Sequence, residues 1–302
     1  MTTKHVVMFS GGVGSWAAAK RVAAEHGTDN LVLLFTDTKT EDEDLYRFIR
    51  EAAADVGGQL VTIADGRDIW QVFRDERFLG NSRIAPCTSR LKRDVADRWL
   101  AENCDPTETV CYVGIDWTEA HRFDGTPTRK GLRRTKAEQG WAFEAPMCKA
   151  PFVAKWQMLR DLERAGIRPP RMYAEGFGHN NCGGMCVKAG IGHWALVWRS
   201  RPATFLHAER KEQEMREYLV RPVTILTETV GGVERPLTLR ELRRRLECGD
   251  QVDMFAHGGC GCFIDADDAQ AVDIVPAVHA LNDALEEHGM YVASITKIGG
   301  AE

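Results

Sequence analysis

Short apolar runs alternate with longer amphipathic segments through the first part of the chain. The apolar runs are HVVMF (5–9), LVLLF (31–35), QLVTIA (59–64) and TVCYVGI (109–115). Helical patterns occupy residues 15–25, 41–56 and 88–102 between them. Continuous apolar strands separated by helices are typical of a parallel sheet with helices on both faces. The pattern therefore predicts an α/β fold whose ligands bind in the loops beyond the carboxyl ends of the strands.

The pattern changes near residue 145. A helical segment (150–165) is followed by a loop rich in Gly, Pro and Asn (166–186) and by a helical stretch (192–219) with a break at Pro202. A hairpin (223–237), a short helix (240–247) and a last helix (269–287) are expected after it. We therefore predict a nucleotide-binding domain over 1–145 and a smaller cysteine-bearing helical region over 146–302.

Composition and charge narrow the class of protein. The 302 residues are 44% hydrophobic and 27% charged, as in ordinary globular proteins, and the net charge of -5 gives no overall attraction to nucleic acid. The most basic stretch (128–136) is interpreted as a solvated loop. There is no signal peptide and no apolar run of about 20 residues, so a cytoplasmic protein is expected. An odd count of nine cysteines indicates metal or redox chemistry rather than a disulfide framework.

The segment SGGVGS lies between the first strand and the first helix. Glycines let backbone N–H groups turn towards an anion, and the start of a helix adds positive potential. Ser10 and Ser15 can donate to phosphate oxygens, and Gly11, Gly12 and Gly14 complete the loop. The spacing matches neither a Walker A loop nor a Rossmann fingerprint. It predicts a phosphate-binding loop of another kind.

This loop resembles the SGGxDS loop of the PP-loop superfamily, whose fold is that of the adenine nucleotide alpha hydrolases. Three further segments resemble its phosphoadenosine phosphosulfate reductase-like group: FTDTKTEDED (35–44), CTSRLKRD (87–94) and VGIDWTEAHR (113–122). The resemblance covers about residues 5–200. It implies an enzyme that binds an adenine nucleotide, either ATP with Mg2+ or a sulfonucleotide (PAPS or APS).

The resemblance also implies roles for residues in these segments. Nucleotide contacts beyond the loop are expected from Asp37, Thr38, Arg90, Lys92, Gly114 and Arg122, and catalytic roles from Cys87, Asp37 and Glu119. Other interpretations stay open. Asp37 lies in a segment rich in helix-capping residues, Glu119 and Arg122 have the spacing of a surface ion pair, and Cys87 is either a nucleophile, a persulfide carrier, a metal ligand or an inert thiol.

Two glycine-rich loops carry paired cysteines. Cys182 and Cys186 have C-x3-C spacing, and Cys260 and Cys262 have C-x-C spacing. Four converging thiolates suit a [4Fe–4S] cluster or, alternatively, Zn2+. A redox-active or persulfide pair and unlinked structural cysteines are the other interpretations. His179 and His257 flank the two loops and could replace a ligand or act as acid–base groups, whereas Cys111, within an apolar strand, is expected in the core.

Gly14 separates two activities. ATP-cleaving members of the superfamily carry Asp at this position, whereas sulfonucleotide reductases tend to carry Gly. The reductases also use a cysteine in a Glu-Cys-Gly-like motif near the C-terminus, and this chain has none. The preferred hypothesis is ATP-dependent adenylation of an acceptor, a nucleic acid or a small molecule, followed by transfer of sulfur or another nucleophile. The alternatives are a sulfonucleotide reductase and a nucleotide- and nucleic-acid-binding module without catalysis.

Overall fold

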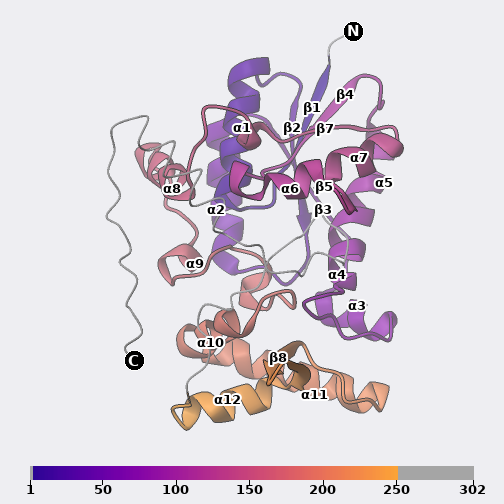
Figure 1. Ribbon diagram of the computed structural model, residues 1–302. Helices are drawn as coiled ribbons and strands as arrows, with labels where there is room; N and C mark the ends of the chain where they lie inside the picture. Colours follow the sequence, from indigo (N-terminus) through magenta and orange to yellow (C-terminus); the bar gives the residue numbers. More distant parts are fainter. Residues whose placement is uncertain (1–2, 251–302) are drawn as a thin grey trace, which may run out of the picture. The chain divides into compact units, whose positions relative to one another are not determined.

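A parallel sheet of five strands organises the residues that the structure, a computed structural model, describes (3–250; Figure 1). Its order is β3-β2-β1-β4-β7, and every neighbouring pair is parallel. The strands are β1 (Lys4–Met8), β2 (Leu31–Asp37), β3 (Gln59–Ala64), β4 (Thr109–Tyr112) and β7 (Ala142–Glu144). This confirms the predicted fold class. The chain order reverses between β1 and β4, and the crevice at such a switch point is where open α/β sheets bind ligands.

Helices cover both faces of the sheet, and Figure 1 shows them on its two sides. One apolar cluster joins α1 (Val13–His26), α2 (Glu43–Val56) and α8 (Lys155–Arg164) to one face. A second joins α5 (Asp94–Asn103), α6 (Ala120–Asp124) and α7 (Leu132–Glu138) to the other. All seven residues of β2 are buried, as expected for a central strand that is covered on both sides.

A third apolar cluster forms a helical module that the sheet does not contribute to. It contains α3 (Ile69–Asp75), α10 (Ile191–Ser200), α11 (Pro202–Leu219), α12 (Leu239–Glu247) and the hairpin of β8 (Leu226–Val230) and β9 (Val233–Leu237). The break at Pro202 and the hairpin are confirmed. Because α3 comes from the first part of the chain, this core is assembled from both predicted regions, and the boundary near residue 145 stays a prediction.

The segment predicted as one helix (88–102) is three elements. A short helix α4 (Pro86–Thr88) leads into a π-helical turn η1 (Ser89–Arg93), and α5 follows. Single π-turns are frequent at functional sites because the extra residue redirects neighbouring side chains. Here Leu91 and Lys92 are both buried. The buried lysine follows from this local geometry.

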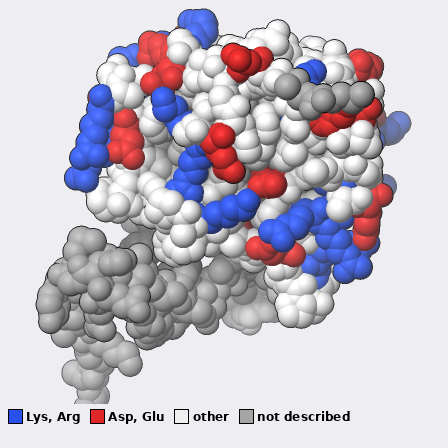
Figure 2. All heavy atoms as spheres, turned by 90° about the horizontal axis from the view of Figure 1, so that it is seen from above, with Lys and Arg blue, Asp and Glu red and all other residues white. Residues whose placement is uncertain are grey.

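The basic stretch predicted to be a solvated loop (128–136) is partly structured. Strands β5 (Gly125–Thr126) and β6 (Arg129–Lys130) pair, and α7 buries Leu132 and Lys136. Its exposed charges have acidic partners: Lys130 and Arg134 contact Glu138, and Arg133 contacts Asp124. On the face drawn in Figure 2, cationic and anionic side chains are likewise interspersed. These ion pairs offset part of the positive charge of this stretch.

The sequence analysis missed two elements, and one predicted helix lies in a part of the chain that the structure does not describe. The strand β7 and the helix α3 were not predicted, since each is short and has little periodicity. The last predicted helix (269–287) lies outside the described residues. None of the helices within residues 3–250 has the length and apolarity needed to cross a membrane.

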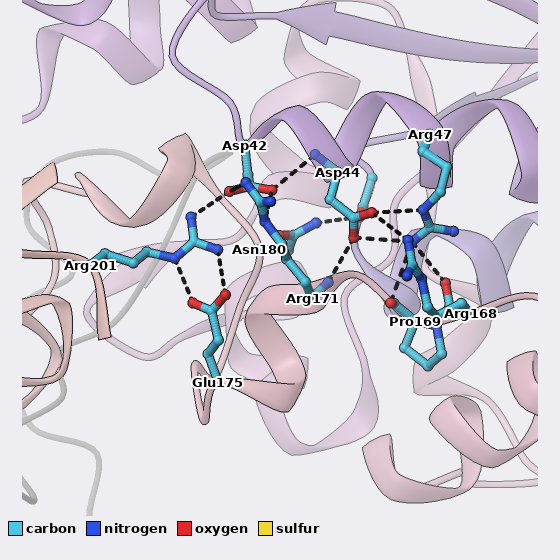
Figure 3. Close-up of polar contacts among 10 residues, drawn as sticks. Asp42, Asp44, Arg47, Arg168, Pro169, Arg171, Glu175, Asn180 and Arg201 are labelled. Atoms are coloured by element: carbon cyan, nitrogen blue, oxygen red, sulfur yellow. Dashed lines mark hydrogen bonds and ion pairs between the residues drawn. The ribbon is translucent and has the colours of Figure 1, made fainter. Parts of the chain in front are cut away.

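A buried ion-pair cluster joins the segment after α8 and the junction between α10 and α11 to the start of α2 (Figure 3). The Asp42 carboxylate, 3% exposed, contacts the guanidinium groups of Arg171, at 2.8 Å, and Arg201. Arg201 also pairs with Glu175 at 2.5 Å. Burial would raise the pKa of Asp42, but hydrogen bonds from the two arginines outweigh it and hold this pKa below its usual range.

Asp44, in the first turn of α2, makes a second set of contacts with the segment after α8. Asp44 accepts a hydrogen bond of 2.8 Å from the Arg171 N–H and pairs with Arg47 and Arg168. The hydrogen bond from Arg47 lowers the pKa of Asp44 to about 2. Together the two carboxylates fix residues 168–175 against α2.

We expect Asp42→Asn to destabilise the protein by about 3 kcal/mol, because it leaves the 12%-exposed Arg201 without its buried anion. Asparagine is as good an N-cap as aspartate, so α2 itself keeps its start. Urea unfolding followed by circular dichroism measures the change. Glu51→Gln, which removes an exposed ion pair on the same helix, is the control and should cost less than about 0.5 kcal/mol. Equal urea midpoints for Asp42→Asn and Glu51→Gln would contradict the stabilising role of the buried Asp42 ion pairs.

Glu212 joins three elements of the helical module. Its side-chain oxygens accept hydrogen bonds from the N–H of Ile225 at 2.9 Å and of Leu239 at 2.8 Å. Glu212 is only 2% exposed. Burial raises its pKa to about 7, although the two N–H donors oppose the shift.

This raised pKa predicts a pH-dependent stability. Below pH 4.5 the carboxyl is protonated in both states, and above about pH 7 it is ionised in both. Between these values the folded state binds more protons, so its stability falls as pH rises. Relative to Glu212→Gln, the wild type should lose up to about 3 kcal/mol over this window in urea titrations. Relative to Glu214→Gln, a site where Lys211 lowers the carboxyl pKa, the wild type should show no such loss, because both proteins keep Glu212. Parallel pH curves for wild type and Glu212→Gln would refute the prediction.

Candidate functional site

The predicted phosphate loop lies at the switch point of the sheet. Residues 10–15 connect the carboxyl end of β1 to the start of α1. Gly11 has a φ of +77°, and a Cβ there would lie 2.4 Å from Cδ1 of Leu45, so only glycine fits. The Ser15 hydroxyl donates to the Gly12 carbonyl at 2.8 Å, which closes the first turn of α1.

Gly14 packs against Gly114, the residue that the resemblance places in the nucleotide site after β4. A Cβ on Gly14 would lie 2.8 Å from the Gly114 carbonyl oxygen, and a Cβ on Gly114 would lie 2.6 Å from the Ser15 nitrogen. Both contacts involve backbone, so neither glycine can gain a side chain without separating the two loops. The backbone packing thus accounts for glycine at position 14.

The loop after α8 contacts the phosphate loop. The Tyr173 hydroxyl, on α9 (Arg171–Ala174), accepts a hydrogen bond of 3.2 Å from the Val13 N–H. The Asn180 side-chain amide approaches the Gly11 carbonyl at 3.5 Å. The Lys155 ammonium lies 5.0 Å from the centre of the Tyr173 ring. Sequence reasoning missed these residues, because a polar loop distant in sequence carries no periodic signal.

Asp37 and Thr38 lie where β2 ends, as predicted. Asp37 accepts hydrogen bonds from Lys39, at 2.7 Å from its ammonium group, and from Tyr46 at 2.8 Å. Burial would raise the pKa of Asp37, but these hydrogen bonds lower it. Asp37 therefore organises its own loop. The Thr38 hydroxyl donates to Glu41 at 3.0 Å.

Glu41 connects three parts of the site and was not predicted. Its side chain is 2% exposed and also accepts a hydrogen bond of 2.6 Å from the Cys182 N–H. The Lys92 ammonium lies 3.6 Å from its other oxygen. Burying a charged pair is costly unless its remaining lone pairs are satisfied, and here they are. Glu41 thus holds the first cysteine loop beside β2 and η1.

Two cavities meet at Lys92. The first, named here the thiol pocket, is lined by Cys87, Cys182 and Cys186 together with Lys92 and Lys188. The second, the loop cavity, is lined by Phe9, Ser10, Leu34, Thr36 and others, and again by Lys92. Cys87, taken from the sequence as a separate candidate, therefore shares one pocket with the C-x3-C pair. The lysine that the resemblance assigns to nucleotide binding stands between thiols and phosphate loop.

Further groups make the neighbourhood electropositive. The rings of His179 and His193 stack with centres 5.2 Å apart. Burial lowers the pKa of His179 to about 3, and the charges of Lys155 and Lys92 act in the same direction. His179 is therefore neutral at physiological pH. A bound anion would compensate the potential that the lysines create here.

Other predicted residues lie apart from these cavities. Arg90 is 47% exposed and pairs with Glu76 and Asp94. Glu119 and Arg122 form an ion pair of 2.6 Å, as their spacing suggested, but Arg122 is only 14% exposed, so the pair is half-buried. Cys111 is fully buried in β4, where burial raises the pKa of its thiol to about 12, so it belongs to the core as expected.

The predicted metal site is only partly within the described residues. Cys260, Cys262 and His257 lie outside them. Within residues 3–250, no three or more His, Cys, Asp or Glu side chains are arranged to hold a metal ion. The three thiols of the pocket are the soft donors that an iron–sulfur cluster or zinc would need, so the site stays a prediction that requires ligands from the remaining residues.

Comparison with known proteins finds a similarity among solved structures. No family model and no curated protein matches the chain. Among solved structures, it is similar to phosphoadenylyl-sulfate (PAPS) reductase from Candida auris in complex with phosphate. The TM-score is 0.39 and the identity 12%, over 58% of this chain and 77% of that chain. PAPS reductases are the group that the sequence motifs resemble. Similarity of this extent assigns no activity to this chain.

Proposed function

We propose that the chain is a PP-loop enzyme that binds an adenine nucleotide and couples it to thiol chemistry. Our preferred reaction is ATP-dependent adenylation of an acceptor followed by sulfur transfer. The observation that carries the proposal is the position of Lys92, which lines both the loop cavity beside Ser10 and the thiol pocket. Nucleotide and thiols would then act on opposite sides of one buried cation.

The residues of the chain suit such a reaction. Backbone N–H groups of the phosphate loop and the Lys92 ammonium would bind and orient the phosphates, and fixed donors of this kind stabilise charge as it develops. An oxygen of the acceptor would attack the α-phosphorus, and pyrophosphate would leave. The terminal sulfur of a persulfide held in the thiol pocket would then displace AMP from the adenylated acceptor. A second thiol would cleave the resulting acceptor–S–S–cysteine bond, which releases the thiolated acceptor as a disulfide forms. A nucleobase or a DNA backbone would be suitable acceptors.

Neither Mg2+ nor a metal cluster is needed for this argument. The Asp37 carboxylate accepts hydrogen bonds from Lys39 and Tyr46 and keeps a lone pair on Oδ2, so Mg2+ bound there would lie beside the Lys39 ammonium group. The proposed [4Fe–4S] or zinc site would use Cys182 and Cys186 with Cys260 and Cys262. If bound, it would supply a Lewis acid or redox centre beside Lys92, and Cys87 would be a further thiol at its edge.

Sulfonucleotide reduction is the second candidate, and Gly14 favours it. The contact with the Gly114 carbonyl leaves no space for the aspartate that ATP-cleaving members carry. In this reaction a thiolate of the pocket would attack the sulfur of adenylyl sulfate. The sulfur–oxygen bond to the phosphate would break and release AMP, and a second thiol would release sulfite as a disulfide forms.

The two candidates predict different products from the same protein. With ATP and an acceptor, the preferred reaction releases pyrophosphate; with adenylyl sulfate and a thiol reductant, the second releases sulfite and AMP. In either case Lys92→Met should lower turnover about 100-fold, because it removes a buried charge at the phosphates. Lys20→Met, which removes a 43%-exposed lysine on α1, is the control and should retain activity.

Enzyme assays with both substrates decide between the possibilities. Turnover that survives Lys92→Met would contradict the role of Lys92. Nucleotide binding without either product would leave the third hypothesis, a binding module without catalysis. A protein that binds neither nucleotide would overturn the proposed function.

The shared lining residue Lys92 gives a separate test. A nucleotide bound beside Lys92 should restrict access to the thiol pocket and slow the alkylation of Cys87 and Cys186 by iodoacetamide several-fold. Cys248, exposed at the end of α12, is the internal control and should react at an unchanged rate. Mass spectrometry of peptides after timed quenching measures each rate. Unchanged rates for Cys87 and Cys186 at saturating nucleotide would separate the thiols from the nucleotide site.

A further inference from the structure

We propose that Tyr173 and Asn180 are nucleotide-binding residues. Tyr173 donates its hydroxyl hydrogen to a phosphate oxygen, and Asn180 accepts a hydrogen bond from a hydroxyl or amino group of the nucleoside. This inference rests on the proposed nucleotide binding and extends it to a wall of the site that no motif contains. It makes the site a product of two distant segments, the phosphate loop and residues 171–186.

Tyr173 stands at the position where an anion meets the start of α1. Its oxygen accepts from the Val13 N–H, the first N–H of the helix, at 3.2 Å. Its hydrogen has no acceptor among the described residues, so it is available to a ligand. Burial raises the pKa of this phenol to about 12, so the hydrogen is present at neutral pH. A Cβ on Gly12 would lie 3.5 Å from the hydroxyl, which shows how closely it approaches the loop.

Asn180 supplies a hydrogen-bond acceptor, whereas Tyr173 supplies a donor. It is 2% exposed, and its amide nitrogen faces the Gly11 carbonyl at 3.5 Å. Its side-chain oxygen is buried and, within residues 3–250, has no hydrogen-bond partner. A buried acceptor left without a donor costs about 1–3 kcal/mol, so such groups are usually satisfied by the protein, by an ordered water or by a ligand. Ribose hydroxyls and the adenine amino group are donors that a nucleotide carries, whereas its phosphates are not.

Charge around the two residues favours an anionic ligand. Lys155 lies over the Tyr173 ring, and Lys92, which Glu41 partly neutralises, lines the loop cavity beside Ser10. His179, next to Asn180, is neutral and adds no charge of its own. The ion pairs of Asp42 and Asp44 with Arg171 hold this segment in place. Both side chains are therefore positioned before a ligand arrives, which lowers the entropic cost of binding.

Calorimetric titrations of the full chain with ATP and with inorganic pyrophosphate test the inference. Tyr173→Phe keeps the ring and loses only the hydroxyl, and it should weaken the binding of both ligands about 10- to 100-fold. Asn180→Ala should weaken ATP binding about 10-fold and leave pyrophosphate binding unchanged, because its partner is on the nucleoside. Tyr218→Phe, on the exposed side of α11, is the matched control and should bind both ligands as the wild type does.

The outcomes separate this inference from the proposed function. If the wild type binds ATP and Tyr173→Phe binds it equally or more tightly, Tyr173 is a spacer or a competitor of the phosphate, and the inference fails alone. If Asn180→Ala weakens both ligands equally, its role is to support the loop. If the wild type binds neither ligand, both proposals fall. Circular dichroism must show native spectra for each variant, and Asn180→Ser replaces Asn180→Ala if that variant does not fold.

Discussion

Asp42 is the residue on which the arrangement of the site depends most. It caps α2, and its buried carboxylate holds Arg171 and Arg201, which lie more than a hundred residues further along the chain. A carboxylate in this environment needs its cations, and the cations need it, because each alone would be a buried charge. These ion pairs therefore determine where the segments after α8 lie. With the start of α9 and the end of α10 fixed to α2, Tyr173, Asn180 and the Cys182–Cys186 loop are held beside the phosphate loop.

Two backbone constraints complete the site. The close approach of Gly14 to Gly114 brings the loops after β1 and β4 together at the switch point of the sheet. The π-helical turn η1 directs Lys92 inward, where Glu41 pairs with it and also accepts from the Cys182 N–H. A nucleotide at the loop and a thiol in the pocket would therefore be separated by one lysine. Because the two cavities share this lysine, nucleotide-linked sulfur chemistry is a coherent hypothesis for the chain.

Gly14 shows how a motif and a structure answer different questions. As a motif position, glycine instead of aspartate divides ATP-cleaving relatives from sulfonucleotide reductases. As a packing position, it is glycine because the Gly114 carbonyl occupies the space of a side chain. The packing constraint holds whichever nucleotide binds. The missing aspartate favours a sulfonucleotide, and groups outside the loop, such as Lys92 and the segment that carries Tyr173, would contribute to the choice of nucleotide.

The sequence by itself determined the parallel α/β fold, the position of the phosphate loop and the strand ends that carry its candidate residues. These depend on periodicity and on glycine spacing, which are local in sequence. Only the tertiary structure decided that Cys87 shares a pocket with Cys182 and Cys186, that Arg90 lies on the surface, and that Tyr173, Asn180 and Glu41 belong to the site. The physical reason is that these relations arise from ion pairs, a π-turn and loop packing between distant segments, and none of them imposes a repeating pattern on the chain.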